Sequence, residues 1–346
     1  MKIPIYPPSS LIEQLPLSPK QVEFISQAQN TCKNIHSQKD QRLAIILGPC
    51  SIHNYESAIE YAHKLKNLSK LVEDSLYLIM RVYVEKPRTT LGWKGLLYDP
   101  YLDGSCDISQ GIALSRRLLL DLADMNIPTA TEFVNPITAN YLRDLISWGF
   151  IGARTSSSQI HRELVSSLNI PIGFKNNTEG NLQLAIDGAL AANAKQSFLG
   201  TDNQGQISQI QSNGNPFTHI VLRGSDKGTN FDAKSIEYTA MLQNTCDLHS
   251  KIIIDCAHGN SSKNPTIQEK VFQTVVQLIK NGNPHILGLM LESFLKRGNQ
   301  TFHLGGDTVA KDISITDPCI DWETTKSLIL WSHKQINSTQ SLPVLL

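Results

Sequence analysis

The feature that most constrains the fold is a theme that the chain repeats eight times: a short apolar run, a polar loop, and a stretch with apolar residues at helical spacing. The apolar runs, expected as strands, lie at 43–48, 76–83, 128–133, 150–155, 171–175, 219–224, 251–256 and 286–291. The helical stretches lie at 55–72, 109–126, 136–148, 160–168, 179–195, 233–247, 264–281 and 321–336. Because the runs are continuously apolar, both faces of each strand are expected to be buried. The pattern predicts a closed (β/α)₈ TIM barrel of the α/β class.

An open, doubly wound sheet is the alternative architecture. The first run ends in the tripeptide GPC at 48–50 and not in a glycine-rich dinucleotide-binding fingerprint, which disfavours that alternative. The chain has 346 residues, so a barrel of about 250 residues leaves room for additions.

The additions are expected at the N-terminus and in three long segments. We expect an N-terminal arm and helix at 1–38 and a barrel catalytic domain at 39–346; residues 1–18 are proline-rich and expected to be irregular, with a helix at 18–36. The segments 84–108, 197–217 and 294–320 exceed what a barrel needs. Gly200, Gly205 and Gly214 at expected turns predict a β-hairpin inserted before strand six, at about 197–217. It would lie away from the active face, so a regulatory or interface role and a hairpin without a role both stay open.

The composition points to small charged substrates. Lys and Arg number 31 and balance 31 Asp and Glu, so no global field attracts nucleic acid, and any anion binding must come from local clustering. We found no signal sequence and no apolar segment near the roughly 18 residues of a membrane span, so we expect a cytoplasmic protein. The six cysteines have no C-x-x-C spacing, which indicates free thiols or a thiolate ligand.

In a barrel, reacting groups collect at the carboxyl ends of the strands and in the loops that follow. Four residues of metal-ligand type would meet there: Cys50, His258, Glu292 and Asp317. They follow strands one, seven and eight, which are neighbours only if the sheet closes. One thiolate, one imidazole and two carboxylates predict a site for one divalent metal, and Mn²⁺, Fe²⁺, Co²⁺ and Zn²⁺ all stay open.

Cations end most of the remaining strands. They are Arg81, Arg154, Lys175 and Arg223. Burying such charges without partners costs several kcal/mol each, so a group of them predicts an anionic ligand. Lys86 and Arg88 stand beside Thr89 in the loop after strand two, a combination that suits phosphate or carboxylate. Glu132 ends strand three and is expected to neutralise these cations, to contact the substrate, or to act as a general acid or base.

Several blocks of sequence carry a resemblance. They are GPCSIH at 48–53, KPRTT at 86–90, GWKG at 92–95, GART at 152–155, GFKN at 173–176 and HGNSSK at 258–263. Together they resemble class I 3-deoxy-D-arabino-heptulosonate-7-phosphate (DAHP) synthase, and the similarity extends from about residue 5 to 335. The resemblance implies a TIM-barrel transferase that condenses phosphoenolpyruvate with erythrose 4-phosphate and water, giving DAHP and phosphate. This reaction is the first step of the shikimate pathway and of aromatic amino-acid biosynthesis.

The resemblance also implies roles for the residues above. By this matching, Cys50, His258, Glu292 and Asp317 hold the metal, and phosphoenolpyruvate is held by Arg81, Lys86, Arg154, Lys175 and Arg223. Lys86 lies close to the reacting centre, and Arg88 and Thr89 contact the aldose phosphate. The implied mechanism is attack of carbon 3 of phosphoenolpyruvate on an aldehyde polarised by the metal, capture of the cation at carbon 2 by water, and loss of phosphate with carbon–oxygen cleavage.

The sequence departs from the family pattern at a few positions, and two other functions compete with the one that the resemblance implies. Ser156 to Ser158 and Asn177 depart from the family's usual residues, but at no matched ligand. Many members are homodimers or homotetramers inhibited by an aromatic amino acid, through a site that includes the N-terminal arm; the arm and the stretch 136–170 are present here. One rival is 3-deoxy-manno-octulosonate-8-phosphate synthase, which uses arabinose 5-phosphate, and the KPRTT block argues against it. The other is a catalytically dead barrel with a binding role, against which the intact metal-ligand set argues.

Overall fold

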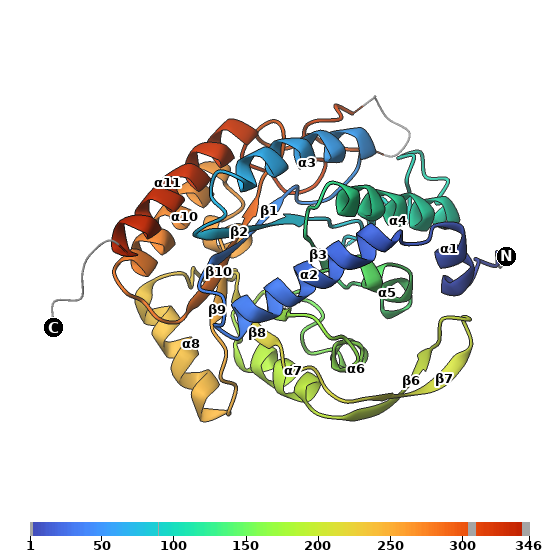
Figure 1. Cartoon of the computed structure of the whole chain (residues 1–346), viewed down its shortest axis with the longest axis horizontal. Helices are drawn as coiled ribbons and strands as arrows, with labels where there is room; N and C mark the ends of the chain where they lie inside the picture. Colours follow the sequence, from blue (N-terminus) through green and yellow to red (C-terminus); the bar gives the residue numbers. More distant parts are fainter. Residues whose placement is uncertain (1–2, 89, 304–308, 341–346) are drawn as a thin grey trace.

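The structure is a computed structural model that describes residues 3–88, 90–303 and 309–340. At its centre, parallel strands pair in the order β1-β10-β9-β8-β5-β4-β3-β2 and close into a barrel (Figure 1). The strands are β1 (Leu43–Gly48), β2 (Leu76–Arg81), β3 (Thr129–Glu132), β4 (Trp148–Ile151), β5 (Ile172–Lys175), β8 (Thr218–Leu222), β9 (Ile252–Asp255) and β10 (Ile286–Glu292). The predicted (β/α)₈ barrel is confirmed and the open sheet is wrong.

Helices surround the barrel; α1 and α2 precede the first strand, α11 follows the last, and the others lie between strands (Figure 1). They are α1 (Pro8–Gln14), α2 (Pro19–His36), α3 (Tyr55–Ser69), α4 (Ile108–Asp124), α5 (Pro136–Leu142), the 3₁₀ turn η1 (Arg143–Leu145), α6 (Gln159–Ser166), α7 (Gln183–Asn193), α8 (Ala233–Thr245), α9 (His258–Ser261), α10 (Pro265–Lys280) and α11 (Trp322–Gln340). Most begin at a polar residue: the Asn54 side chain, for example, accepts from the Ser57 backbone N–H at the start of α3.

The N-terminal helix α2 covers the amino end of the barrel. Cys32 and Ile35 of α2 pack in one buried cluster with Ile46 and Trp148 from the barrel interior. The His36 Nε2 hydrogen-bonds the Thr218 carbonyl at 3.2 Å, which fixes the end of α2 beside β8. With its amino end filled, the barrel is open to ligands at its carboxyl end.

Three sequence predictions about the fold are corrected. Residues 1–18 are not wholly irregular, because α1 forms at Pro8–Gln14; a proline in the first turn of a helix lacks only an N–H that would have had no partner. The fourth strand begins at Trp148 instead of 150 and ends at Ile151. The backbone N–H groups of Thr155 and Ser156 both bond the Gly152 carbonyl, so Arg154 lies in a turn after β4 and does not end the strand.

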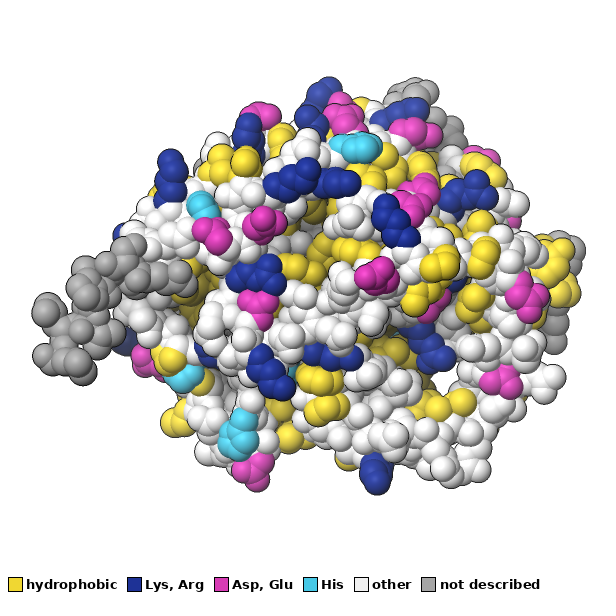
Figure 2. All heavy atoms as spheres, viewed as in Figure 1, with side chains coloured by type: hydrophobic (Ala, Val, Ile, Leu, Met, Phe, Trp, Pro, Cys, Tyr) yellow, Lys and Arg dark blue, Asp and Glu magenta, His cyan; other side chains and the backbone are white. Residues whose placement is uncertain are grey.

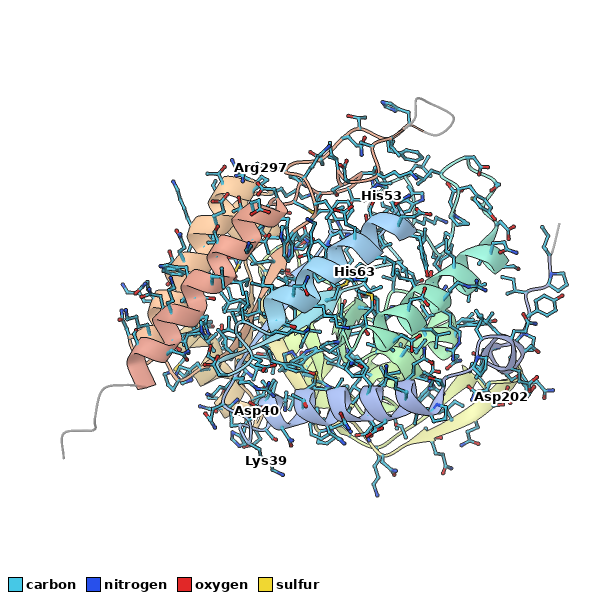
Figure 3. The ribbon with its side chains drawn as sticks, turned by 45° about the horizontal axis from the view of Figure 1, so that its top comes forward. Lys39, Asp40, His53, His63, Asp202 and Arg297 are labelled. Carbon is cyan, nitrogen blue, oxygen red and sulfur yellow. The ribbon has the colours of Figure 1, made fainter. Side chains whose placement is uncertain are left out.

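The predicted hairpin is present as β6 (Gln196–Thr201) and β7 (Ile207–Ser212), paired antiparallel. Gly205, with φ +75°, is at its tip, but Gly200 lies within β6 opposite Ser208, so its predicted place at a turn is wrong. The hairpin runs along the outside of the barrel toward α1, and Figure 3 shows Asp202 at this end. There the Ser9 N–H donates to the Asn203 carbonyl at 2.8 Å. The fold thus has the predicted N-terminal extension and inserted hairpin; the domain division at 38 stays a prediction.

The surface agrees with the neutral composition. On the face shown in Figure 2, side chains of both charges are interspersed. Of the helices that the structure describes, none is long and apolar enough to cross a membrane.

Candidate active site

A cavity of about 250 Å³ opens at the carboxyl end of the barrel. Its lining residues are Lys86, Pro87, Arg88, Thr90, Glu132, Gly152, Ala153, Arg154, Lys175, Arg223, His258, Lys263, Thr316 and Asp317. The two groups of cations expected from the sequence, one in the loop after β2 and one at later strand ends, therefore line a single cavity. Thr89, predicted to contact a substrate, lies outside the described residues.

Three of the four predicted metal ligands converge at one side of this cavity. Ligand atoms of Cys50, Glu292 and Asp317 all lie within 4.8 Å of one another. The closing strand pair explains the first two, since Gly48 at the end of β1 stands opposite Glu292 at the end of β10. The loop of Asp317 is attached where the Ile320 N–H donates to the Glu292 carbonyl at 3.0 Å.

His258, the fourth predicted ligand, lies beside this group and not within it. Its Nε2 is 3.6 Å from Glu292 Oε1, while its Nδ1 is 2.9 Å from Asp255 Oδ2. The hydrogen bond to Asp255 fixes the ring and directs Nε2 toward Glu292, the arrangement that metal-binding histidines commonly have.

The chemistry of the donor set fits a divalent cation of borderline softness, because it combines a sulfur with carboxylates. Burial and the neighbouring Glu292 carboxylate raise the pKa of the Cys50 thiol to about 11. Burial alone would raise the pKa of Asp317, but Lys86, His258 and Lys263 outweigh it and hold that pKa below its usual value. We therefore regard Cys50, Glu292 and Asp317 as a candidate metal site.

Lys86 connects this site to the rest of the cavity. Its Nζ lies 3.2 Å from both the carbonyl oxygen and Sγ of Cys50. Burial alone would lower the pKa of Lys86, but Cys50 and the carboxylates of Glu292, Glu132 and Asp317 outweigh it and raise that pKa, so the side chain keeps its charge.

The cations across the cavity differ in how they are held. Lys175 pairs with the buried carboxylate of Asp255 at 2.7 Å. Arg223 is 8% exposed, and its NH1 is buried without a hydrogen-bond partner among the described residues. Arg81 is fully buried behind the cavity, where its NH2 donates to Glu292 Oε1 at 3.0 Å and its guanidinium lies 4.0 Å from the centre of the Tyr83 ring. Contact with a substrate stays a prediction for each of these residues.

Glu132 points into the same space from the end of β3. A Cβ added at Gly152 would lie only 2.1 Å from Glu132 Oε1, so the absence of a side chain at 152 gives this carboxylate its room. Glu132 is 8% exposed. Its position among cations agrees with two of the roles considered for it, neutralisation and contact with the substrate.

Comparison with known proteins gives the family. The sequence profile described as the DAHP synthetase I family matches residues 15–329. The chain belongs to the DAHP synthetase I family. It is 43% identical to the Tyr-sensitive phospho-2-dehydro-3-deoxyheptonate aldolase of Escherichia coli K12, over 95% of this chain and 92% of that protein. It is 42% identical to the Trp-sensitive enzyme of Shigella flexneri, over 93% and 92% of the two chains.

A solved structure agrees in fold. The phospho-2-dehydro-3-deoxyheptonate aldolase of Francisella tularensis SCHU S4 matches with a TM-score of 0.95 at 40% identity, and 98% of each chain is covered. As a member of the DAHP synthetase I family, the chain is an enzyme, a transferase of the DAHP synthase type. The resemblance stated from the motifs is confirmed.

For this DAHP synthetase I family member, sequence reasoning gave no role to two residues at or behind the cavity: Asp255, noted only as a polar residue near the active loops, and Lys263. Asp255 is fully buried, and although burial would raise its pKa, Lys175 and His258 outweigh it and hold that pKa well below its usual range. The sequence feature that could have indicated a role for Asp255 is its place directly after the apolar run of isoleucines 252–254, at the end of a buried strand. Lys263 lines the cavity and pairs with Asp317 at 3.0 Å; it ends the HGNSSK block, which marked it without giving it a role.

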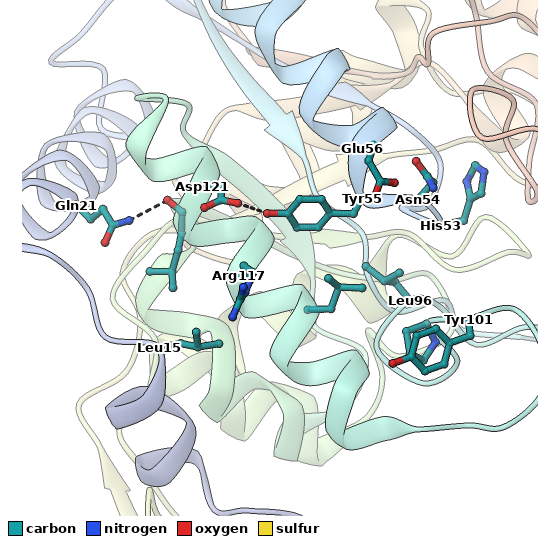
Figure 4. A pocket seen from close by; sticks show the side chains of 13 residues that line it. Leu15, Gln21, His53, Asn54, Tyr55, Glu56, Leu96, Tyr101, Arg117 and Asp121 are labelled. Carbon is teal, nitrogen blue, oxygen red and sulfur yellow. Dashed lines mark hydrogen bonds between the residues drawn. The ribbon is translucent and has the colours of Figure 1, made fainter.

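The cavity just described is not the largest hollow of this family member. A wider one of about 720 Å³ lies between the starts of α2 and α3 and the side of α4 (Figure 4). There the Tyr55 hydroxyl donates to Asp121, and Gln21 Nε2 donates to the Leu120 carbonyl at 3.0 Å. It contains none of the predicted site residues, so charge and not size identifies the active cavity.

Proposed function

We propose that this chain is a 3-deoxy-7-phosphoheptulonate synthase, which condenses phosphoenolpyruvate with D-erythrose 4-phosphate and water to give DAHP and phosphate, the first step of the shikimate pathway. The observation that carries the proposal is one cavity that reaches the candidate metal site through Asp317 and whose lining is rich in cations, among them Arg223, whose NH1 has no partner among the described residues. A buried guanidinium N–H without a partner is costly unless a ligand accepts from it.

Phosphoenolpyruvate carries a phosphate and a carboxylate, and the cavity offers cations for both. We assign them to Lys86, Arg154, Lys175 and Arg223. Arg81 is not among the residues that line the cavity and is paired with Glu292, so its predicted contact with phosphoenolpyruvate rests on the family resemblance. Arg88 and Thr90 line the wall that we assign to the phosphate of the aldose. The contact of Thr89 with that phosphate is inferred from the family resemblance alone.

Cys50, Glu292, Asp317 and His258 would hold one divalent ion, either Mn²⁺, Fe²⁺, Co²⁺ or Zn²⁺. When bound, such an ion supplies a Lewis acid that polarises a carbonyl oxygen. Lys86 stands between that site and the other cations. Its ammonium, beside Cys50, is placed to stabilise negative charge that develops on the reacting groups.

We also propose that an aromatic amino acid regulates the enzyme. Two relatives are named for their sensitivity, to tyrosine and to tryptophan. A cavity of about 540 Å³ between α5, α6 and the hairpin has apolar walls that include Ile137, Ile160 and Phe198, with Arg143 and Glu163 at its polar side. An apolar space with both charges beside it suits an amino acid with a large side chain.

The N-terminal arm reaches the hairpin on this side of the molecule, where Ile3 and Tyr6 are largely exposed. Exposed apolar residues at an ordered arm agree with a homodimer or homotetramer, in which a neighbouring subunit covers them.

The reaction is tested by phosphate release from phosphoenolpyruvate by the purified chain with Mn²⁺, with erythrose 4-phosphate or arabinose 5-phosphate as co-substrate. We expect release with erythrose 4-phosphate. A preference for arabinose 5-phosphate would assign the chain to the octulosonate reaction, and release with neither sugar would leave a binding protein.

A further inference from the structure

The loop that carries Lys86 is held together by its own backbone. The Lys86 N–H donates to the Lys94 carbonyl at 2.8 Å, and the Leu97 N–H donates to the Val84 carbonyl at 3.1 Å. Trp93 Nε1 donates to the Asp99 carbonyl at 3.0 Å. These bonds make the loop a unit, but they all lie within residues 84–99 and do not fix it to the barrel.

Glu85 and Tyr98 attach this unit to the first turn of α5. The Thr138 hydroxyl donates to Glu85 Oε2 at 2.9 Å. Asn135 Nδ2 donates to the Tyr98 hydroxyl at 3.1 Å, and Tyr98 also hydrogen-bonds the Glu85 carboxyl. Asn135 is itself fixed as the N-cap of α5, where its side chain accepts from the Ile137 N–H. The two ends of the loop are thus fastened to one short helix.

A carboxyl at position 85 is costly for the fold. Glu85 is only 5% exposed, and its Oε1 is buried without a partner among the described residues. Burial raises its pKa to about 7. An apolar side chain would avoid these costs, so the acid at this place calls for a role, and its hydrogen bonds to Thr138 and Tyr98 indicate what that role is.

Consecutive side chains of the segment point to opposite sides. Glu85 points to Thr138 on α5, whereas Lys86 points to Cys50 in the active cavity. The backbone between them cannot shift without breaking one of these contacts. We propose that Glu85 is a positioning residue, whose bonds to Thr138 and Tyr98 hold the Lys86 ammonium at the candidate metal site. The consequence for catalysis rests on the proposed function, but the positioning itself does not.

Two readouts test this inference on the full chain. The first is the rate at which a small acylating reagent modifies Lys86, followed by mass spectrometry, which does not depend on turnover. The second is the pair of kcat and KM for phosphoenolpyruvate.

Four variants are compared. Glu85→Ala and Thr138→Val remove the hydrogen bond between the loop and α5, Glu85→Gln keeps an acceptor for Thr138, and Thr129→Val is the matched control. Thr129 also makes a buried hydroxyl bond, to the Leu145 carbonyl at 2.9 Å, but lies at the start of β3.

We expect Glu85→Ala to change the labelling rate of Lys86 and to lower kcat/KM, each by about tenfold, with a smaller change of the same kind in Thr138→Val. Glu85→Gln should stay within about threefold of the wild type, as the conservative variant that keeps the bond. If Glu85→Ala does not fold, Thr138→Val alone decides. Labelling and kinetics that match those of Thr129→Val in both variants would overturn the inference. If the wild-type chain itself shows no turnover, but the labelling rate of Lys86 still changes in Glu85→Ala and Thr138→Val, the positioning is supported and the proposed function is rejected.

Discussion

Lys86 Nζ lies 3.2 Å from Cys50 Sγ, although the two residues are 36 positions apart and follow different strands. The contact brings the main cation of the loop after β2 to the edge of the candidate metal site. Lys86 therefore contacts the candidate metal site and also lines the cavity with the other cations. Replacing Cys50 should affect metal binding, whereas replacing Lys86 should affect the rate alone.

Replacing Cys50 by Ala should abolish tight metal binding, because it removes the only sulfur of the candidate donor set. The fold should persist, since the change deletes a single buried atom. Metal content by atomic absorption and far-UV circular dichroism check this. Cys106→Ala, at an exposed free thiol, is the control and should keep its metal. A Cys50→Ala chain that binds metal as the control does would contradict the assignment.

Replacing Lys86 by Met should leave the metal content intact and lower kcat by about a hundredfold or more, because it removes the ammonium that lies 3.2 Å from Cys50 Sγ and lines the cavity. Lys39→Met is the control, at an exposed position beyond the end of α2 (Figure 3) that is not among the residues lining the cavity. Steady-state kinetics of both variants measure the effect. Equal rates in the two would remove Lys86 from the reaction.

Glu85 should make the stability of the chain depend on pH. Its pKa is raised from 4.5 to about 7, first by burial and also by the charge of Glu132, so the folded state binds a proton more tightly than the unfolded state. As the pH rises through the range between these two pKa values, the free energy of unfolding falls, by about 2 to 3 kcal/mol from pH 5 to pH 8. Glu85→Gln abolishes this loss.

Denaturant unfolding of the wild type and Glu85→Gln at both pH values measures the difference. We expect Glu85→Gln to gain stability over the wild type as pH rises, whereas Glu56→Gln, at an exposed acid on α3, should show no such trend. A trend of the opposite sign would mean that the Glu85 carboxylate is stabilised in its ionised form.

The cavity between α5, α6 and the hairpin should bind an inhibitor. Tyrosine, phenylalanine or tryptophan should lower the rate, and Ile160→Asp should relieve that inhibition without changing the uninhibited rate, because a carboxylate would line an apolar wall. Leu71→Asp changes an equally exposed leucine elsewhere and should remain inhibited. Inhibition that survives Ile160→Asp would place the regulatory site elsewhere.

Barrel closure made much of the site predictable from the sequence. The position of Cys50, Glu292 and Asp317 followed from one rule, that the ends of the first and last strands of a barrel are neighbours. Lys175 and Arg223 were placed at the cavity by a second rule, that the carboxyl ends of all the strands lie at one end of the barrel. Both rules depend only on the order of the strands, which the apolar runs indicate.

Local geometry was less predictable. The end of the fourth strand was misplaced because Gly152 begins a turn that a run of apolar residues does not reveal. Arg81 ends its strand as expected, yet its guanidinium is occupied by Glu292, a partner distant in sequence. Glu85 was missed because its significance depends on burial against α5, and a glutamate next to a lysine in a sequence predicts only a solvated pair.

The most direct test of the account is the mass of the product formed from phosphoenolpyruvate and erythrose 4-phosphate by the chain, first freed of metal with a chelator and then supplied with Mn²⁺, Fe²⁺, Co²⁺ or Zn²⁺. We predict a seven-carbon phosphorylated acid and one released phosphate per phosphoenolpyruvate consumed, only after a metal is restored. Equal product formation by the chelated enzyme would contradict the metal site, and phosphate release without the seven-carbon product would contradict the condensation.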